Sequence, residues 1–112
     1  MRNLPISCWA REDIPTNRAE ELGYKALSDV ELLSIVIGSG SVYNNSVELA
    51  REVLYHCNNN VKNLSKLSER DLLKMKGLGK TKLARIMAAM ELGTRAYDAS
   101  REEKPQLSTA TT

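Results

Sequence analysis

The sequence predicts an all-α fold, a small helical domain, and three observations lead to that prediction. Its core-forming residues are mostly Leu, Ile, Val, Met and Ala, which favour helices, and Phe is absent from the 112 residues. A Ser followed three positions later by a carboxylate, which is typical of a helix start, occurs in two matching segments. Those two segments are copies of one pattern, forty residues apart. The length suits one domain with a modest core.

The first fifteen residues (1–15) are expected to form an N-terminal arm. Its apolar residues are Ile6, Trp9 and Ile14. We expect Trp9 to pack on the helices and so anchor the arm. Residues 16–22 can then form a short helix, which Gly23 stops because glycine readily adopts the conformation that follows a helix end.

The repeat supplies the next helices. Residues 27–33, Leu-Ser-Asp-Val-Glu-Leu-Leu, match residues 67–73, Leu-Ser-Glu-Arg-Asp-Leu-Leu. In both copies the Ser is a predicted N-cap, and the carboxylate three residues later is able to complete a capping box. The sequence therefore predicts two helices that begin in the same way.

Each of these helices ends at a Gly-x-Gly turn, at residues 38–40 and 77–79. Apolar residues recur at helical spacing after both turns, from a Ser46 cap in the first copy and from about Lys80 in the second. The sequence therefore predicts two duplicated helix–hairpin–helix units, at about 27–57 and 67–93, within a domain that spans 16–97. A polar break at 57–60 and one helical turn at 61–64 join the units. Apolar periodicity is lost over 98–112, which predicts a flexible tail or an interdomain linker.

Composition excludes several classes of protein. No run of about 18 apolar residues is present, so no membrane span and no membrane partner is expected. The first residues lack the apolar segment of a secretory signal. The only cysteines, Cys8 and Cys57, are too few for a disulfide framework. We therefore expect a cytoplasmic protein.

Charge is concentrated around the second turn. The formal net charge is only +2, and residues 32–47 carry no charge at all. By contrast, residues 72–90 hold five basic side chains and no acidic one. These side chains are Lys74, Lys76, Lys80, Lys82 and Arg85. Such a cluster favours an anionic ligand.

The Gly77-Leu78-Gly79 turn has the features of a phosphate-binding hairpin. Glycines let the chain turn sharply and let a ligand approach without meeting a Cβ atom, and the N–H groups that begin the next helix can bind a phosphate oxygen. The candidate nucleic-acid-binding residues are Lys76, Gly77, Gly79, Lys80, Thr81, Lys82 and Arg85. Amides and lysines recognise phosphates and not bases, so the predicted partner is DNA, bound at low affinity without sequence preference.

A purely structural interpretation stands beside this one. Glycine is common after helices, and a lysine-rich first turn can be a solvated surface. For Gly38-Ser39-Gly40 the structural interpretation is favoured, because its surroundings are uncharged.

The second hairpin, Leu72-x-x-Met75-x-Gly77-Leu78-Gly79, resembles the helix–hairpin–helix motif of DNA-repair and replication proteins. A wider pattern is similar to the N-terminal domain of RadC-type proteins, over about residues 6–96. It consists of Trp9, Glu12-Asp13-x-Pro15, Gly23, Leu27-Ser28-Asp29-x-Glu31-Leu32-Leu33, Gly38-Ser39-Gly40, Glu48-Leu49-Ala50, Gly77-Leu78-Gly79 and Glu91-Leu92-Gly93. One departure is Leu83, where the motif usually has a small residue; here Ala84 comes next.

The resemblance implies a DNA-binding module of a DNA-repair-type protein. In that family the usual C-terminal partner is a JAB/MPN-type zinc metallopeptidase-like domain, which needs two His, an Asp and a Glu. This sequence contains only His56, so that domain is not expected here, although a longer chain could carry it.

Other chemistry finds little support. Gly79-Lys80-Thr81 is similar to the end of a nucleotide-binding P-loop, but the required earlier glycine is replaced by Lys74. Neither cysteine has the spacing of a zinc site, and Cys57 fits a core position. We expect no catalytic residues, metal or cofactor, and no enzyme activity from this chain. The serious alternative is a protein-interaction or scaffolding domain that positions a C-terminal metallopeptidase-like domain, which an exposed Trp9, Tyr43 or Tyr55 would favour.

Overall fold

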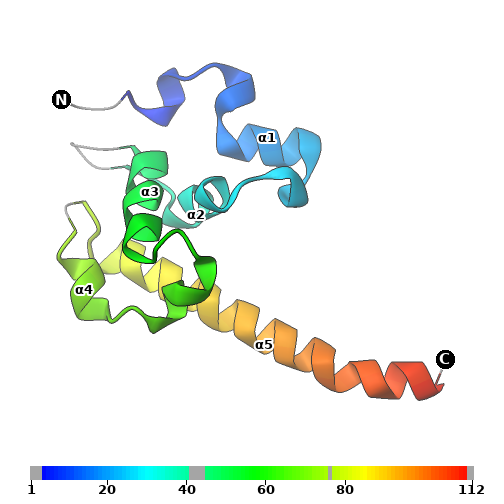
Figure 1. The fold of residues 1–112 in the computed structure, drawn as a ribbon. Helices are drawn as coiled ribbons and strands as arrows, with labels where there is room; N and C mark the ends of the chain where they lie inside the picture. The colour runs from blue at the N-terminus through cyan, green and yellow to red at the C-terminus, as the bar shows by residue number, and fades with distance from the viewer. Residues whose placement is uncertain (1–3, 41–44, 76, 111–112) are drawn as a thin grey trace.

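The computed structural model describes residues 4–40, 45–75 and 77–110, with only the backbone given over 103–110. Every regular element in these segments is helical, which confirms the all-α prediction (Figure 1). None of the described helices combines the length and the apolar character that a membrane span requires. The 3₁₀ helices are η1 (Ile6–Cys8), η2 (Arg11–Asp13), η3 (Tyr24–Ala26) and η4 (Val61–Lys66). The α-helices are α1 (Pro15–Leu22), α2 (Asp29–Ile37), α3 (Ser46–His56), α4 (Glu69–Leu73) and α5 (Lys80–Ala110).

The N-terminal arm contains η1 and η2 and crosses above α3 before it enters α1 (Figure 1). A hydrogen bond from Asn45 Nδ2 to the carbonyl oxygen of Leu4, at 2.9 Å, joins it to the start of α3. Trp9 is half-buried, in a cleft of about 730 Å³ between the arm and helices α1, α2 and α3. The indole therefore lies beside the helices without being enclosed by them.

Helix α1 ends and helix α2 begins as their sequences predict, and α1 starts one residue earlier than predicted, at Pro15. Gly23 has a φ of +86° directly after α1, so it ends that helix. At the start of α2, Ser28 Oγ accepts from the Glu31 amide, and a Glu31 carboxylate oxygen accepts from the Ser28 amide. The predicted capping box is thus present in full in the first copy. In the second copy, Ser68 Oγ accepts from the Asp71 amide.

The cap of α3 differs from the prediction. Asn45, not Ser46, is the N-cap residue: its side-chain oxygen accepts from the Glu48 amide at 2.9 Å. Ser46 is the first residue of the helix and is buried. Asn and Ser are both favoured N-cap residues. The N-cap is the residue whose backbone is extended just before the helix, and here that residue is Asn45.

A tight turn follows α3. Asn58 and Asn59 both have positive φ, near +58° and +56°, and the Asn60 amide donates to the carbonyl of Cys57 at 3.1 Å. These values define a type I′ turn. It accounts for the predicted polar break, and the helical turn after it is longer than predicted, reaching Lys66.

The core lies where α2, α3 and α5 meet, and α4 and η4 close it. The largest fully enclosed side chains are Ile37, Leu49, Val53, Cys57, Leu72 and Ile86. Cys57 is therefore a core residue, as predicted, and burial raises the pKa of its thiol.

Helix α5 continues far beyond the core. Every side chain described from Glu91 to Glu102 is exposed, and this half of the helix projects from the body of the molecule (Figure 1). The backbone is helical to Ala110, where the sequence predicts a flexible tail from residue 98. Losing apolar periodicity removes packing but does not remove helix propensity. The flexible tail or interdomain linker over 98–112 stays a prediction.

Candidate nucleic-acid interface

The hairpin between α4 and α5 is anchored by its central residue. Leu78 is only 3% exposed and belongs to the core cluster, while the flanking Gly79 is exposed. Gly77 has a φ of +85°, which a residue with a side chain rarely adopts. The Leu78 amide donates to the Met75 carbonyl, and Leu83 donates to Gly79 as the first turn of α5 forms. Gly-Leu-Gly thus buries one side chain and leaves its backbone at the surface.

The start of α5 is open to a ligand. A Cβ placed on Gly79 would meet no atom within 4 Å, so nothing in the described structure covers this backbone. The first turn of α5 carries no acidic residue. Lys80 and Thr81 are exposed, and no hydrogen bond or ion pair joins the side chain of Lys80 to another residue that the structure describes. Unpaired N–H groups and a cation here suit an anion.

Lys80 faces α4. It lines a shallow hollow with Glu69 and Leu73, and the remaining walls come from α5 itself, from Leu83, Ala84 and Met87. Its ammonium group therefore adds positive charge on the side of the hairpin that α4 borders.

Lys82 lies toward α2, away from Lys80. Its Nζ donates to the carbonyl oxygens of Gly40, at 3.0 Å, and of Gly77, at 3.1 Å. The side chain is half-buried, so the ammonium group joins the two Gly-x-Gly turns.

Arg85 is the second side chain of α5 that donates to a backbone carbonyl near the first turn. One of its terminal guanidinium nitrogens donates to the carbonyl of Ile37, the last residue of α2, at 3.0 Å. The same nitrogen is 2.3 Å from the position that a Cβ on residue 38 would take, so a side chain there would collide with the guanidinium group. The backbone of Gly38 has a φ of +88°.

The six predicted site residues that the structure describes therefore do not form one patch. Gly77, Gly79, Lys80 and Thr81 lie together at the open hairpin, while Lys82 bridges the two turns and Arg85 contacts the end of α2. Lys76 lies outside the described residues, as does Tyr43. The fifth cation of the basic cluster, Lys74, lines a separate hollow with Glu52, His56 and Asp71.

The sequence did not predict that backbone carbonyls at the end of α2 and in the first hairpin accept hydrogen bonds from Arg85 and Lys82. One signal was available. The predicted helix that ends before Gly38 lies in the uncharged segment 32–47, so its last carbonyls have no basic residue of their own segment as a donor. Residues 72–90, by contrast, hold cations without acidic neighbours. A helix C-terminus favours cations, so the two segments are complementary. The pairing itself spans more than forty residues and has no local pattern.

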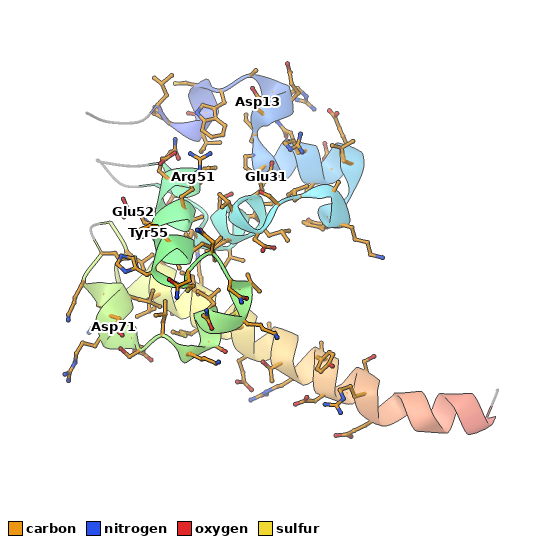
Figure 2. The ribbon with its side chains drawn as sticks, viewed as in Figure 1. Asp13, Glu31, Arg51, Glu52, Tyr55 and Asp71 are labelled. Carbon is orange, nitrogen blue, oxygen red and sulfur yellow. The ribbon has the colours of Figure 1, made fainter. Side chains whose placement is uncertain are left out.

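The cleft beneath the arm is a separate hollow, of about 730 Å³. Figure 2 places Asp13 on the arm, with Glu31 of α2 and Arg51 of α3 below it. Both basic residues that line the cleft are already paired, Arg18 with Glu31 and Arg51 with Glu48. Within the described residues, no group of three or more His, Cys, Asp or Glu side chains could hold a metal ion.

Comparison with known proteins places the chain in a family. The model of the UPF0758 N-terminal domain matches residues 6–84. A UPF0758 protein of Flavobacterium johnsoniae is 41% identical over 93 residues, which cover 83% of this chain and 40% of that protein. A UPF0758 protein of Staphylococcus epidermidis is 38% identical over 104 residues, covering 93% of this chain and 46% of that protein. The chain thus spans less than half the length of these relatives. No solved structure matches it.

Proposed function

The chain belongs to the UPF0758 family, the RadC-like family that the sequence resemblance anticipated, and from this premise we propose that it is a sequence-independent DNA-binding module. The proposed site is the Gly77-Leu78-Gly79 hairpin, where one phosphate oxygen accepts from the amides that begin α5. Lys80 adds the nearby positive charge. In this proposal the two helix pairs, α2 with α3 and α4 with α5, are helix–hairpin–helix units. The chain itself carries no enzyme activity and acts in the cytoplasm in a DNA-repair-type protein.

One observation supports the proposal most directly, namely that the start of α5 is open and its first turn contains no acidic residue. Helix starts normally carry Asp or Glu, which stabilise the positive end of the helix dipole. Here the first turn offers Lys80, Thr81 and Lys82 instead, beside an uncovered Gly79. An anionic ligand at this end would supply the missing negative charge.

The experiment that tests this proposal reverses one charge. Lys80→Glu should weaken binding of a short fluorescein-labelled DNA duplex, measured by fluorescence anisotropy at low salt. Lys25→Glu is the matched control, because Lys25 is also an exposed lysine and lies in η3, outside the hairpin. Equal affinities for the two variants would refute a phosphate site at this hairpin.

A protein-interaction or scaffolding role is the second candidate, and the projecting half of α5 favours it. Leu92 and Tyr97 are 68% and 63% exposed on a helix segment with no described neighbour. Tyr55 is also exposed, at 74%. If the unmodified chain binds no DNA at low salt, this role becomes the better account, and the partner in the longer relatives would be the segment beyond the matched region.

A further inference from the structure

The two Gly-x-Gly turns are joined by hydrogen bonds from α5. Lys82 Nζ donates to one carbonyl on each turn, Gly40 and Gly77, and Arg85 donates to Ile37 immediately before the first turn. All three acceptors are neutral backbone oxygens. These side-chain hydrogen bonds therefore link the open hairpin to the end of α2, in addition to the core packing between α2 and α5.

The acceptors need these donors. The last carbonyls of a helix lack partners within the helix, and α2 ends at Ile37 with no basic residue in its last turn. Cations stabilise a helix C-terminus, so Arg85 of α5 supplies what α2 lacks. Moving Lys82 to a phosphate would leave the carbonyls of Gly40 and Gly77 without that donor, which is unfavourable at Gly77, where the contact is partly buried.

We infer that Lys82 and Arg85 are positioning residues, which clamp the second hairpin to the first, and that they are not phosphate ligands. The effect of these two residues on DNA binding rests on the proposed function, whereas their hydrogen bonds to the first hairpin do not depend on it. The clamp (Lys82, Arg85 and the carbonyls of Ile37, Gly40 and Gly77) holds the Gly79 backbone and Lys80 in the binding arrangement before the ligand arrives. Preorganisation of this kind raises affinity by reducing the ordering cost of binding.

The first hairpin therefore contributes to the site without touching the ligand. Gly38 is essential to this role, because a side chain there would displace the guanidinium group of Arg85. Gly23 is a comparison: it has nearly the same φ, +86° against +88°, and open space around the Cβ position, but its ψ is 158° where that of Gly38 is −59°. The backbone strain of the two Ala substitutions therefore differs, and only Gly38→Ala disturbs the clamp.

The first test separates ligands from positioning residues through salt dependence. For duplex DNA, each phosphate contact contributes about 0.9 to the slope of log affinity against log salt concentration. Lys80→Met should weaken binding and reduce that slope by about 0.9. Lys82→Met should weaken binding several-fold at each salt concentration and leave the slope as in the unmodified chain. A slope reduced equally by both variants would make Lys82 a ligand and overturn the inference.

The second test needs no DNA. Gly38→Ala should lower the Tm by about 4 °C more in the unmodified chain than in the Arg85→Met variant, the size expected for one hydrogen bond in a domain of this length. The backbone strain of Ala at residue 38 is the same in both backgrounds, and only the unmodified chain has a guanidinium group to displace. Equal shifts in the two backgrounds would refute the clamp.

The two proposals can fail separately. If the unmodified chain does not bind the duplex, the proposed function and the positioning role are both wrong, and the Tm measurements alone decide whether the clamp exists. If the chain binds DNA and Gly38→Ala binds as tightly as Gly23→Ala, the phosphate site stands and the positioning role is wrong.

Discussion

Arg18 and Glu31 form the ion pair that joins α1 to α2, with 2.6 Å between Arg18 Nε and Glu31 Oε2. The other carboxylate oxygen of Glu31 accepts from the Ser28 amide at 3.1 Å. The amide of Ser28, and then the guanidinium group of Arg18, favour the charged form and lower the pKa of Glu31, against the opposing effect of burial. One side chain thus completes a helix cap and holds the preceding helix.

The first prediction concerns the pH dependence of stability. A lowered pKa means that Glu31 stabilises the fold fully above its unfolded value of about 4.3 and loses that contribution as the pH falls through its folded value. Glu31→Gln should therefore lower the free energy of unfolding at pH 7 by about 1 kcal/mol, because the neutral amide loses the ion pair with Arg18 and the charge-assisted bond from the Ser28 amide. It should have less effect at pH 3. Urea unfolding at both pH values checks this, with the exposed Glu20→Gln as control. A cost that is the same at both pH values would contradict the prediction.

The second prediction compares two adjacent leucines of α4. Leu72 is fully buried, and Leu73 is 42% exposed. Leu72→Ala should lower the free energy of unfolding by about 2–5 kcal/mol, because it leaves a cavity between α4 and the core. Leu73→Ala should cost less than half as much. Chemical denaturation measures both, and Leu72→Met serves as the milder variant if Leu72→Ala does not fold.

The third prediction separates the two functions of Asn45. Its side-chain oxygen caps α3 and its amide nitrogen binds the carbonyl of Leu4. Asn45→Asp keeps the cap and loses the donor, so it should release the arm while it leaves the Tm nearly unchanged. Cleavage by trypsin after Arg11 should then be faster. Asn45→Ala loses both contacts and should also lower the stability by about 1 kcal/mol. If Asn45→Asp is cut no faster than the unmodified chain, the Leu4 contact does not hold the arm.

The fourth prediction concerns the turn at Asn58 and Asn59. Both residues have positive φ, which glycine adopts without strain and alanine does not. Asn59→Ala should lower the free energy of unfolding by about 1 kcal/mol. Asn59→Gly should match or exceed the original stability, because Asn-Gly is the favoured pair for this turn. Thermal unfolding followed by circular dichroism tests the order Gly, Asn, Ala, and any other order would argue against the type I′ geometry.

Local signals predicted the local structure well. The capping box at Ser28 and the stop at Gly23 depend on residues within one or two turns, and both are present. Asn45 was missed because Ser46 beside it is an equally good cap residue. The helical course of residues 98–110 was missed because apolar spacing reports burial and not helix formation.

The candidate site was predictable only in part. The glycines of the second hairpin and the basic cluster are evident in the sequence, but the separation of Lys80 from Lys82 is not. Which cation meets which carbonyl depends on how α5 packs against α2, and that packing is set by core residues far apart in the chain, such as Ile37 and Ile86. Local charge patterns therefore do not predict which cation binds which carbonyl.

The projecting end of α5 also determines how the molecule moves in solution. The radius of gyration is 16.4 Å, whereas a compact domain of this length has about 13 Å. The long dimension is 58 Å against 35 and 23 Å for the others. Rotation about the long axis is therefore faster than end-over-end tumbling. Nuclear relaxation of amides along α5 would follow the slower of these motions, and so would the anisotropy decay of a dye attached rigidly near Arg101.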